Sequence, residues 1–171
     1  MGGVSEERGF SRVAQQCGDD LAGFVYGVGT INLRSFQRLN QADFLNDFRA
    51  NALGAALAVQ AVLPALKESP GIASVVLFSS VAALQGFPLH ASMSMAKGAV
   101  TGLTLALAAE LARKIRVNAI APSLTRTKLA KRLLINEPLA ASIAGLHALP
   151  RLGKPEDMAE LAAFLISPAA D

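Results

Sequence analysis

The chain has 171 residues, of which 52% are hydrophobic and 17% charged, and its formal net charge is only +3. This composition excludes a disordered polar tail, and the length allows one domain with a sizeable core. The 16 basic residues are dispersed along the chain. The sequence therefore predicts a globular protein that does not bind nucleic acid.

Cysteine, histidine and the N-terminus set the expected compartment. Cys17 is the only cysteine, which fits a reducing compartment, and no cysteine–histidine cluster has metal-ligand spacing. Residues 1–7 are polar and acidic, unlike a signal peptide. Every long apolar run is broken by a charged residue, proline or glycine before it reaches spanning length. We expect a cytoplasmic protein with no membrane segment and no metal site.

The apolar pattern predicts an alternation of helices and strands. In chain order we expect a helix over 5–16 capped by Ser5, a strand over 21–28, a loop over 30–39, a helix over 41–67 opened by Asn40 or Asp43, a strand over 73–78, a helix over 92–113, a strand over 116–121, and helices over 128–136, 139–146 and 155–167. Strands that alternate with helices predict an α/β fold with a parallel sheet and right-handed crossovers. No linker interrupts the pattern, so residues 1–171 are expected to form a single domain.

Two serines and a lysine in the middle of the chain have a distinctive spacing. Ser79 and Ser80 end the strand over 73–78, and Met93 follows Ser80 by 13 residues and precedes Lys97 by four. This arrangement resembles the short-chain dehydrogenase/reductase family. In that family two serines end a strand, and a Tyr-x-x-x-Lys motif follows at the same distance.

Further blocks match the same family in order and spacing. They are Asn51-Ala52-Leu53-Gly54, Val62-Leu63-Pro64, Val117-Asn118-Ala119-Ile120-Ala121-Pro122-Ser123, Thr125 with Thr127, and Gly153-Lys154-Pro155-Glu156-Asp157 with Phe164-Leu165. The resemblance implies a partial Rossmann-type, doubly wound parallel sheet that contains strands 4–6 of the family order. The glycine-rich N-terminal βαβ unit and the C-terminal strand of the family have no counterpart in these residues, so we expect a domain truncated at both ends.

The resemblance also implies the site residues. Ser80 would orient the substrate oxygen, Lys97 would bind the nicotinamide ribose, and Asn51 would hold a water molecule that connects the lysine to solvent. The cofactor would be NAD or NADP, and the substrate a small carbonyl compound or alcohol. The residues implied to bind the cofactor are Gly27, Gly29, Lys97, Pro122, Ser123, Thr125 and Thr127.

Met93 departs from the family because it occupies the position of the catalytic tyrosine. A thioether has no proton to give, so efficient reduction by the standard mechanism is not expected. His90 is the candidate for a substitute acid, since an imidazole changes its charge near neutral pH. Tyr26, the only tyrosine, is expected at a strand end beside the adenine or ribose.

Three hypotheses follow. The chain is an impaired or atypical NAD(P)-dependent oxidoreductase, a non-catalytic binding or regulatory homologue, or a dimerising fragment. By resemblance, the helices over 41–67 and 92–113 would form the interface of a homodimer or homotetramer. In the family, further strands pair with the outer edges of the strands over 21–28 and 116–121. Without these partner strands both edges would be open, so we expect the chain to be poorly soluble and to associate.

Overall fold

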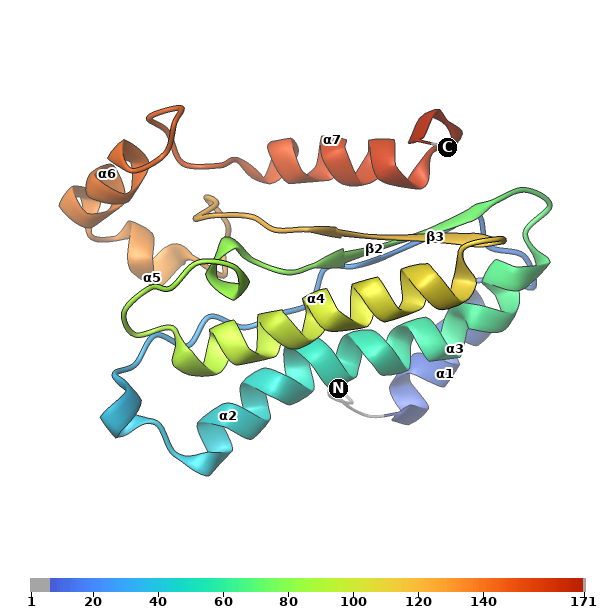
Figure 1. The fold of residues 1–171 in the computed structure, drawn as a ribbon, viewed down its shortest axis with the longest axis horizontal. Coiled ribbons are helices and arrows are strands. Elements are labelled where there is room, and N and C mark those ends of the chain that lie inside the picture. The colour runs from blue at the N-terminus through green and yellow to red at the C-terminus, as the bar shows by residue number, and fades with distance from the viewer. Residues whose placement is uncertain (1–6, 171) are drawn as a thin grey trace.

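Three parallel strands form the middle layer of the molecule, and helices cover both faces (Figure 1). The computed structural model describes residues 7–170. The strands are β1 (Gly23–Tyr26), β2 (Ala73–Phe78) and β3 (Ile115–Ile120). The helices are α1 (Glu7–Gln16), α2 (Gln41–Phe48), α3 (Gly54–Glu68), α4 (Ala91–Leu111), α5 (Lys131–Leu134), α6 (Glu137–Gly145) and α7 (Pro155–Ile166). Shorter helical turns are η1 (Phe36–Arg38), η2 (Arg49–Leu53), η3 (Val81–Ala83) and η4 (Pro168–Ala170).

The strand order is β1–β2–β3, and both neighbouring pairs are parallel. The register places Val25 beside Val76, and Val76 beside Asn118. Parallel neighbours require crossover connections, which α2 and α3 provide for the first pair and α4 for the second. These observations confirm the predicted α/β fold with a parallel sheet. In the described part of the chain, β1 and β3 are the two edges of the sheet.

β2 is the central strand and is buried on both faces. Val75 and Leu77 belong to the larger core, which α3 and α4 complete, whereas Val76 and Phe78 pack under α7. Fully burying such a side chain contributes roughly 1.5–3 kcal/mol. The continuous apolar run over 73–78 therefore reports burial from both sides, as expected for a parallel sheet.

Two predicted elements have the wrong length. The strand predicted over 21–28 ends at Tyr26, because the chain then turns away from β2 and the Thr30 amide donates to Asn51 Oδ1 at 3.3 Å. The helix predicted over 128–136 contracts to α5. Asn136 ends that region because its side chain accepts a hydrogen bond from the Leu139 amide at 3.0 Å and so begins α6.

The long helical stretch Gln41–Glu68 begins with a capping box. Both predicted caps take part: Asn40 accepts from the Asp43 amide, and the Asp43 carboxylate accepts from the Asn40 amide. The predicted cap Ser5 lies outside the described residues. By length and composition this stretch could cross a membrane. Val59 and Val62 are buried in the larger core, so in this fold the stretch is a core helix.

Candidate active site at the carboxyl ends of the strands

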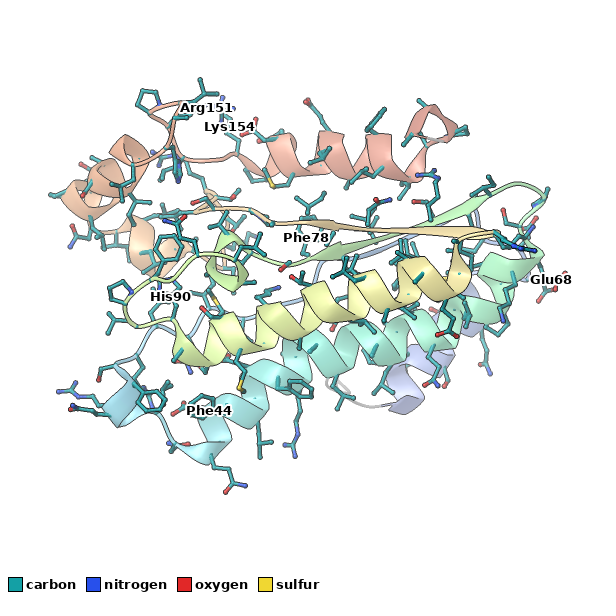
Figure 2. All side chains as sticks on the ribbon, viewed as in Figure 1. Phe44, Glu68, Phe78, His90, Arg151 and Lys154 are labelled. Carbon is teal, nitrogen blue, oxygen red and sulfur yellow. The ribbon has the colours of Figure 1, made fainter. Side chains whose placement is uncertain are left out.

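The predicted site residues follow the carboxyl ends of the three strands. Gly29 comes after β1, Ser80 after β2 and Pro122 after β3. In open α/β sheets the ligand crevice lies at this edge. Figure 2 places His90 and Arg151 at this end of the molecule, whereas Glu68 lies at the opposite end.

Lys97 projects from α4 toward the end of β2. Its side chain is largely buried, the residue being 8% exposed, and its Nζ donates to the Phe78 carbonyl at 2.7 Å. Burial penalises the charged ammonium and lowers the pKa of Lys97 to about 8. Ser79 fixes the same turn of α4, because its hydroxyl donates to the Lys97 carbonyl at 3.1 Å.

Gly29 lies directly against Lys97 and Asn51. A Cβ atom added to Gly29 would lie 2.8 Å from Asn51 Oδ1 and 3.3 Å from Lys97 Nζ. The first distance is shorter than a real Cβ contact, so the close approach requires glycine. The structure therefore brings together three of the predicted site residues. At Gly27, by contrast, an added Cβ would meet open space.

Asn51 sits in the π-helical turn η2, and π turns inside helices are frequent at functional sites. Its Nδ2 donates to Thr30 Oγ1 and to the Asp47 carbonyl, both at 2.8 Å. Its Oδ1 accepts from the Thr30 amide. The protein thus uses both amide hydrogens, which fixes the orientation of the side chain. The expected water-holding role of Asn51 stays a prediction.

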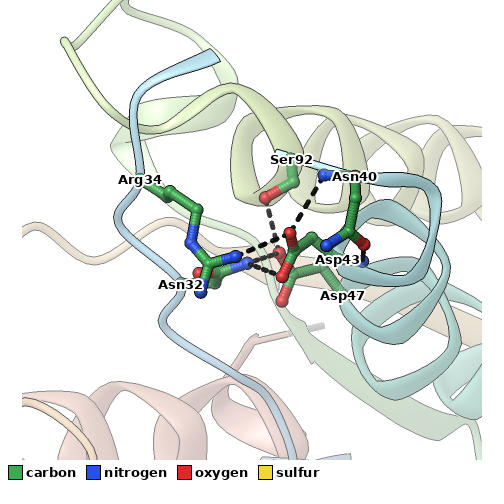
Figure 3. Close-up of polar contacts among 6 residues, drawn as sticks. All are labelled: Asn32, Arg34, Asn40, Asp43, Asp47 and Ser92. Atoms are coloured by element: carbon green, nitrogen blue, oxygen red, sulfur yellow. Dashed lines mark hydrogen bonds and ion pairs between the residues drawn. The ribbon is translucent and has the colours of Figure 1, made fainter. Parts of the chain in front are cut away.

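Asp47 is a buried carboxylate that sequence reasoning missed. It is 2% exposed and accepts from Ser92 Oγ at 2.6 Å and from Asn32 Nδ2 at 3.3 Å (Figure 3). It also accepts from Thr30 Oγ1 at 2.7 Å. These bonds join α2, the start of α4 and the loop after β1. A second, more exposed part of the network pairs Arg34 with Asp43 at 2.9 Å. Because Ser92 precedes Met93, Asp47 also fixes the turn that carries the methionine.

Ser80 connects the ends of β2 and β3. Its hydroxyl accepts from the Ala82 amide at 3.1 Å and donates to the Pro122 carbonyl at 3.4 Å. The Val81 amide donates to the same carbonyl at 3.1 Å. These bonds hold the loop that follows β2 against the loop that follows β3, where cofactor residues were predicted.

Met93 and His90 lie at the start of α4, and their surroundings differ. Met93 is 7% exposed and therefore packs as a core side chain. His90 precedes the helix, and its Nδ1 lies 2.6 Å from the Pro88 carbonyl. Because a carbonyl only accepts, Nδ1 carries the hydrogen and Nε2 keeps its lone pair when the ring is neutral.

A hollow of about 550 Å³ lies beside His90. It is lined by Phe36, Ala82, Ala83, Leu84, Gln85, Gly86, Phe87, Leu89, His90, Ala91 and Ser94. The lining is mostly apolar, and the imidazole is one of few polar groups in it. The hollow borders both the loop after Ser80 and the turn around Met93.

The residues predicted after β3 make mainly local contacts. Thr125 Oγ1 donates to the Ser123 carbonyl at 3.1 Å, and Thr127 Oγ1 accepts from the Ala130 amide at 3.3 Å. The Ser123 hydroxyl lies 2.8 Å from His147 Nε2. The side chains are therefore placed at the expected edge of the sheet, and their cofactor contacts remain predictions.

Tyr26 ends β1 as predicted, but the expectation that its side chain lines the adenine or ribose is wrong. The residue is 4% exposed, and its hydroxyl donates to the Ala50 carbonyl at 2.9 Å. Burial raises its pKa to about 12. Its ring contacts Phe10 with centroids 6.4 Å apart, so Tyr26 is a core residue between β1 and the helices.

Within residues 7–170, no three His, Cys, Asp or Glu side chains gather as a metal site.

An open parallel sheet with polar residues at its carboxyl edge defines a Rossmann-type α/β domain. A family model described as enoyl-(acyl carrier protein) reductase matches residues 5–171. Dehydrogenase/reductase SDR family member 4 from Homo sapiens is 39% identical over 118 residues, which are 68% of this chain and 42% of that protein. 2-(S)-hydroxypropyl-CoM dehydrogenase 3 from Xanthobacter autotrophicus is 33% identical over 162 residues, covering 92% of this chain and 63% of that protein.

A solved structure described as ElxO with NADP bound has a TM-score of 0.87 and 27% identity, and the match covers 97% of this chain and 69% of that one. The chain belongs to the short-chain dehydrogenase/reductase family, which confirms the resemblance seen in the sequence. It spans less than half the length of the human relative.

Proposed function

We propose that the chain carries the substrate-side half of an NAD(P)-dependent oxidoreductase that acts on a small carbonyl compound or alcohol. The observation that carries this proposal is the cluster of Lys97, Asn51 and Gly29 at the carboxyl edge of the sheet. A buried lysine is uncommon unless its ammonium has a task or a partner. The cluster lies at the carboxyl edge of the sheet, the edge at which open α/β sheets bind their ligands, which supports a dinucleotide as its occupant.

The residues present fit a nicotinamide ribose. Lys97 Nζ has three N–H donors, and one of them is used by the Phe78 carbonyl. The other two would suit the ribose hydroxyls, and the bare backbone of Gly29 leaves room beside them. When bound, the nicotinamide would supply or accept a hydride. Support for a dinucleotide also comes from the NADP-bound relative.

The proton step is proposed to be atypical because of Met93. Ser80 would orient the substrate oxygen, but the buried thioether of Met93 has no proton to exchange with it. His90 is the proposed substitute acid. Its ring lines the apolar hollow together with Ala82 and Ala83 from the loop after Ser80. Nδ1 is bonded to the Pro88 carbonyl, so Nε2 is the ring nitrogen left for the substrate. A protonated His90 would donate through Nε2.

Calorimetry with NADH and NADPH tests the proposal. We expect no heat with the 171-residue chain and clear heat with a chain extended at its N-terminus by the family's first βαβαβ unit, which carries the glycine-rich turn. In the extended chain, Lys97→Met is expected to weaken binding, while the exposed Lys67→Met leaves it unchanged. Absence of heat from both chains would refute the proposal.

A non-catalytic binding homologue is the second candidate, and the burial of Met93 supports it. A homodimer or homotetramer through residues 41–67 and 92–113 is also proposed. Support comes from exposed apolar side chains on these helices: Leu45, Phe48, Leu53, Met95 and Leu105. Sedimentation that shows only monomer would contradict the assembly.

A further inference from the structure

Ser123, one of the residues predicted to bind the cofactor, forms a hydrogen-bonded pair with His147, which is not part of the predicted site. Ser123 Oγ lies 2.8 Å from His147 Nε2, and His147 Nδ1 lies 2.7 Å from the Arg151 carbonyl. The carbonyl can only accept, so Nδ1 carries the hydrogen of the neutral ring. Nε2 then has a free lone pair and accepts the hydrogen of the Ser123 hydroxyl. This is the protonation state in which a histidine serves as a base for a serine.

The three groups are held by a hydrogen-bonded frame. The Gly153 amide donates to the Leu124 carbonyl at 3.1 Å, and the Arg126 amide donates to the Gly153 carbonyl at 2.9 Å. The segment that carries Ser123 is therefore bonded to the segment that carries the Arg151 carbonyl. The Arg151 guanidinium is in turn paired with Asp157 on α7 at 2.5 Å. The group that orients His147 is thus fixed independently of the histidine.

Ser123 is exposed and follows Pro122 at the end of β3, so a ligand can reach its hydroxyl. A nucleophile and a base in hydrogen-bond contact, with a third group that orients the base, form the general pattern of an activated hydroxyl. Positive charge is near in the chain, because Arg126 and Lys128 come three and five residues after Ser123 and are both exposed. A cationic side chain that reached the attacked carbonyl would favour the oxyanion that forms there.

We infer that Ser123 and His147 form a nucleophilic site for activated carboxylic esters. Ser123 Oγ would attack the ester carbonyl while His147 Nε2 takes the hydroxyl proton. The carbon–oxygen bond to the leaving alcohol would then break, and the alcohol would leave with the proton from Nε2. Water, deprotonated by the same nitrogen, would then attack the acyl-serine; the bond to Ser123 Oγ would break, the acid would leave, and Nε2 would return the proton to Oγ. No electrons are transferred, so this activity is independent of any nicotinamide cofactor.

The 171-residue chain can be tested directly with a fluorophosphonate probe and with p-nitrophenyl acetate. Mass mapping of the labelled, unmutated chain is expected to place the phosphonyl group on Ser123. Ser123→Ala and His147→Gln should each slow labelling by about 10²-fold, the usual scale of general-base help. Gln can keep the bond to Ser123 but cannot take its proton. The exposed serine of α6 gives the matched control, Ser142→Ala, which should label at the original rate.

Two results would overturn the inference. One is an unlabelled Ser123 in a chain whose circular dichroism shows the α/β fold. The other is labelling that survives His147→Gln at the original rate. Either result would make the Ser123–His147 bond a structural contact between the loop after β3 and the end of α6. Because the mapping uses the unmutated chain and no cofactor, its outcome does not depend on variant folding or on nicotinamide binding.

Discussion

The buried ammonium of Lys97 should make the stability of the chain depend on pH. Its pKa falls from 10.5 to about 8 on folding because burial disfavours the charged form. Between these values the unfolded chain binds more protons than the folded chain, so the free energy of unfolding rises with pH. With ~1.4 kcal/mol for each pKa unit, the full penalty at neutral pH is about 3 kcal/mol, and about 2 kcal/mol of it is relieved by pH 9.5.

The assay compares the chain with Lys97→Met by urea unfolding, followed by circular dichroism at low protein concentration. We expect Lys97→Met to be more stable at pH 7, by up to about 3 kcal/mol, and its advantage to shrink by about 2 kcal/mol at pH 9.5. The range stops below pH 10 because the raised pKa of Tyr26, about 12, makes stability fall with pH above its unfolded value of 10.

Lys67→Met is the matched control. Lys67 is exposed, so its ammonium is hydrated in both the folded and the unfolded chain, and the difference from the unmutated chain should be flat with pH. An equally flat difference for Lys97→Met would refute the reasoning, because it would mean that Nζ is not buried beside Phe78.

Three further predictions concern the fold around the site. Asp47→Ala should destabilise the chain by about 3 kcal/mol in urea unfolding, because it leaves the buried Ser92 hydroxyl without its acceptor. The control Asp20→Ala, at an exposed position, should leave the stability nearly unchanged. Equal losses of stability in the two variants would contradict the hydrogen bonds described for Asp47. Gly29→Ala should lower the melting temperature more than Gly27→Ala, because only a Cβ atom at position 29 meets the Asn51 side chain. The opposite order would contradict the close approach of Gly29 to Asn51. The chain alone should associate through its strand edges, and a sharp, reversible thermal transition in dilute buffer would argue against this.

The elements were predictable where one local signal dominated. The β-branched run over 73–78 is a strand because both faces are buried, and its bounds are as predicted. The length of the strand predicted over 21–28 was overestimated. The chain leaves the sheet where the Thr30 amide bonds to Asn51, which lies 21 residues further along the chain. The length of the helix predicted over 128–136 was overestimated, because the Asn136 side chain caps the start of the next helix instead of continuing this one.

The site was predictable only where spacing carried the information. Lys97 and Asn51 were found from family spacing, and the structure places both beside Gly29. Asp47 gave no such signal, since an aspartate in an amphipathic helix is usually solvated, and its burial depends on loops that come together in three dimensions. Ser123 and His147 are separated by 24 residues, and only the return of the chain after α6 brings them into contact.

A second structural lesson comes from Tyr26. A tyrosine at a strand end next to two glycines suggested a ligand contact, but the hydroxyl finds its acceptor at Ala50 in the helix packed beneath the sheet. Burial of an aromatic ring with one satisfied hydroxyl is a common solution in protein cores. The residues of the strand alone do not indicate that Tyr26 is buried in the core, because its acceptor, the Ala50 carbonyl, lies 24 residues further along the chain.

The central claim is that this family site keeps Ser80, Lys97 and Asn51 but lacks its usual proton donor at Met93. The most direct test is Met93→Tyr in the chain extended by the N-terminal βαβαβ unit, with carbonyl reduction followed by NADPH and NADH oxidation. The account predicts a gain in kcat/KM of about 10²–10⁴-fold, the usual scale of general acid catalysis. An unchanged kcat/KM in Met93→Tyr would contradict the claim that the missing tyrosine hydroxyl limits the reaction. The slow reduction expected of the extended chain before this substitution should be lost in His90→Ala, because His90 is the proposed substitute acid.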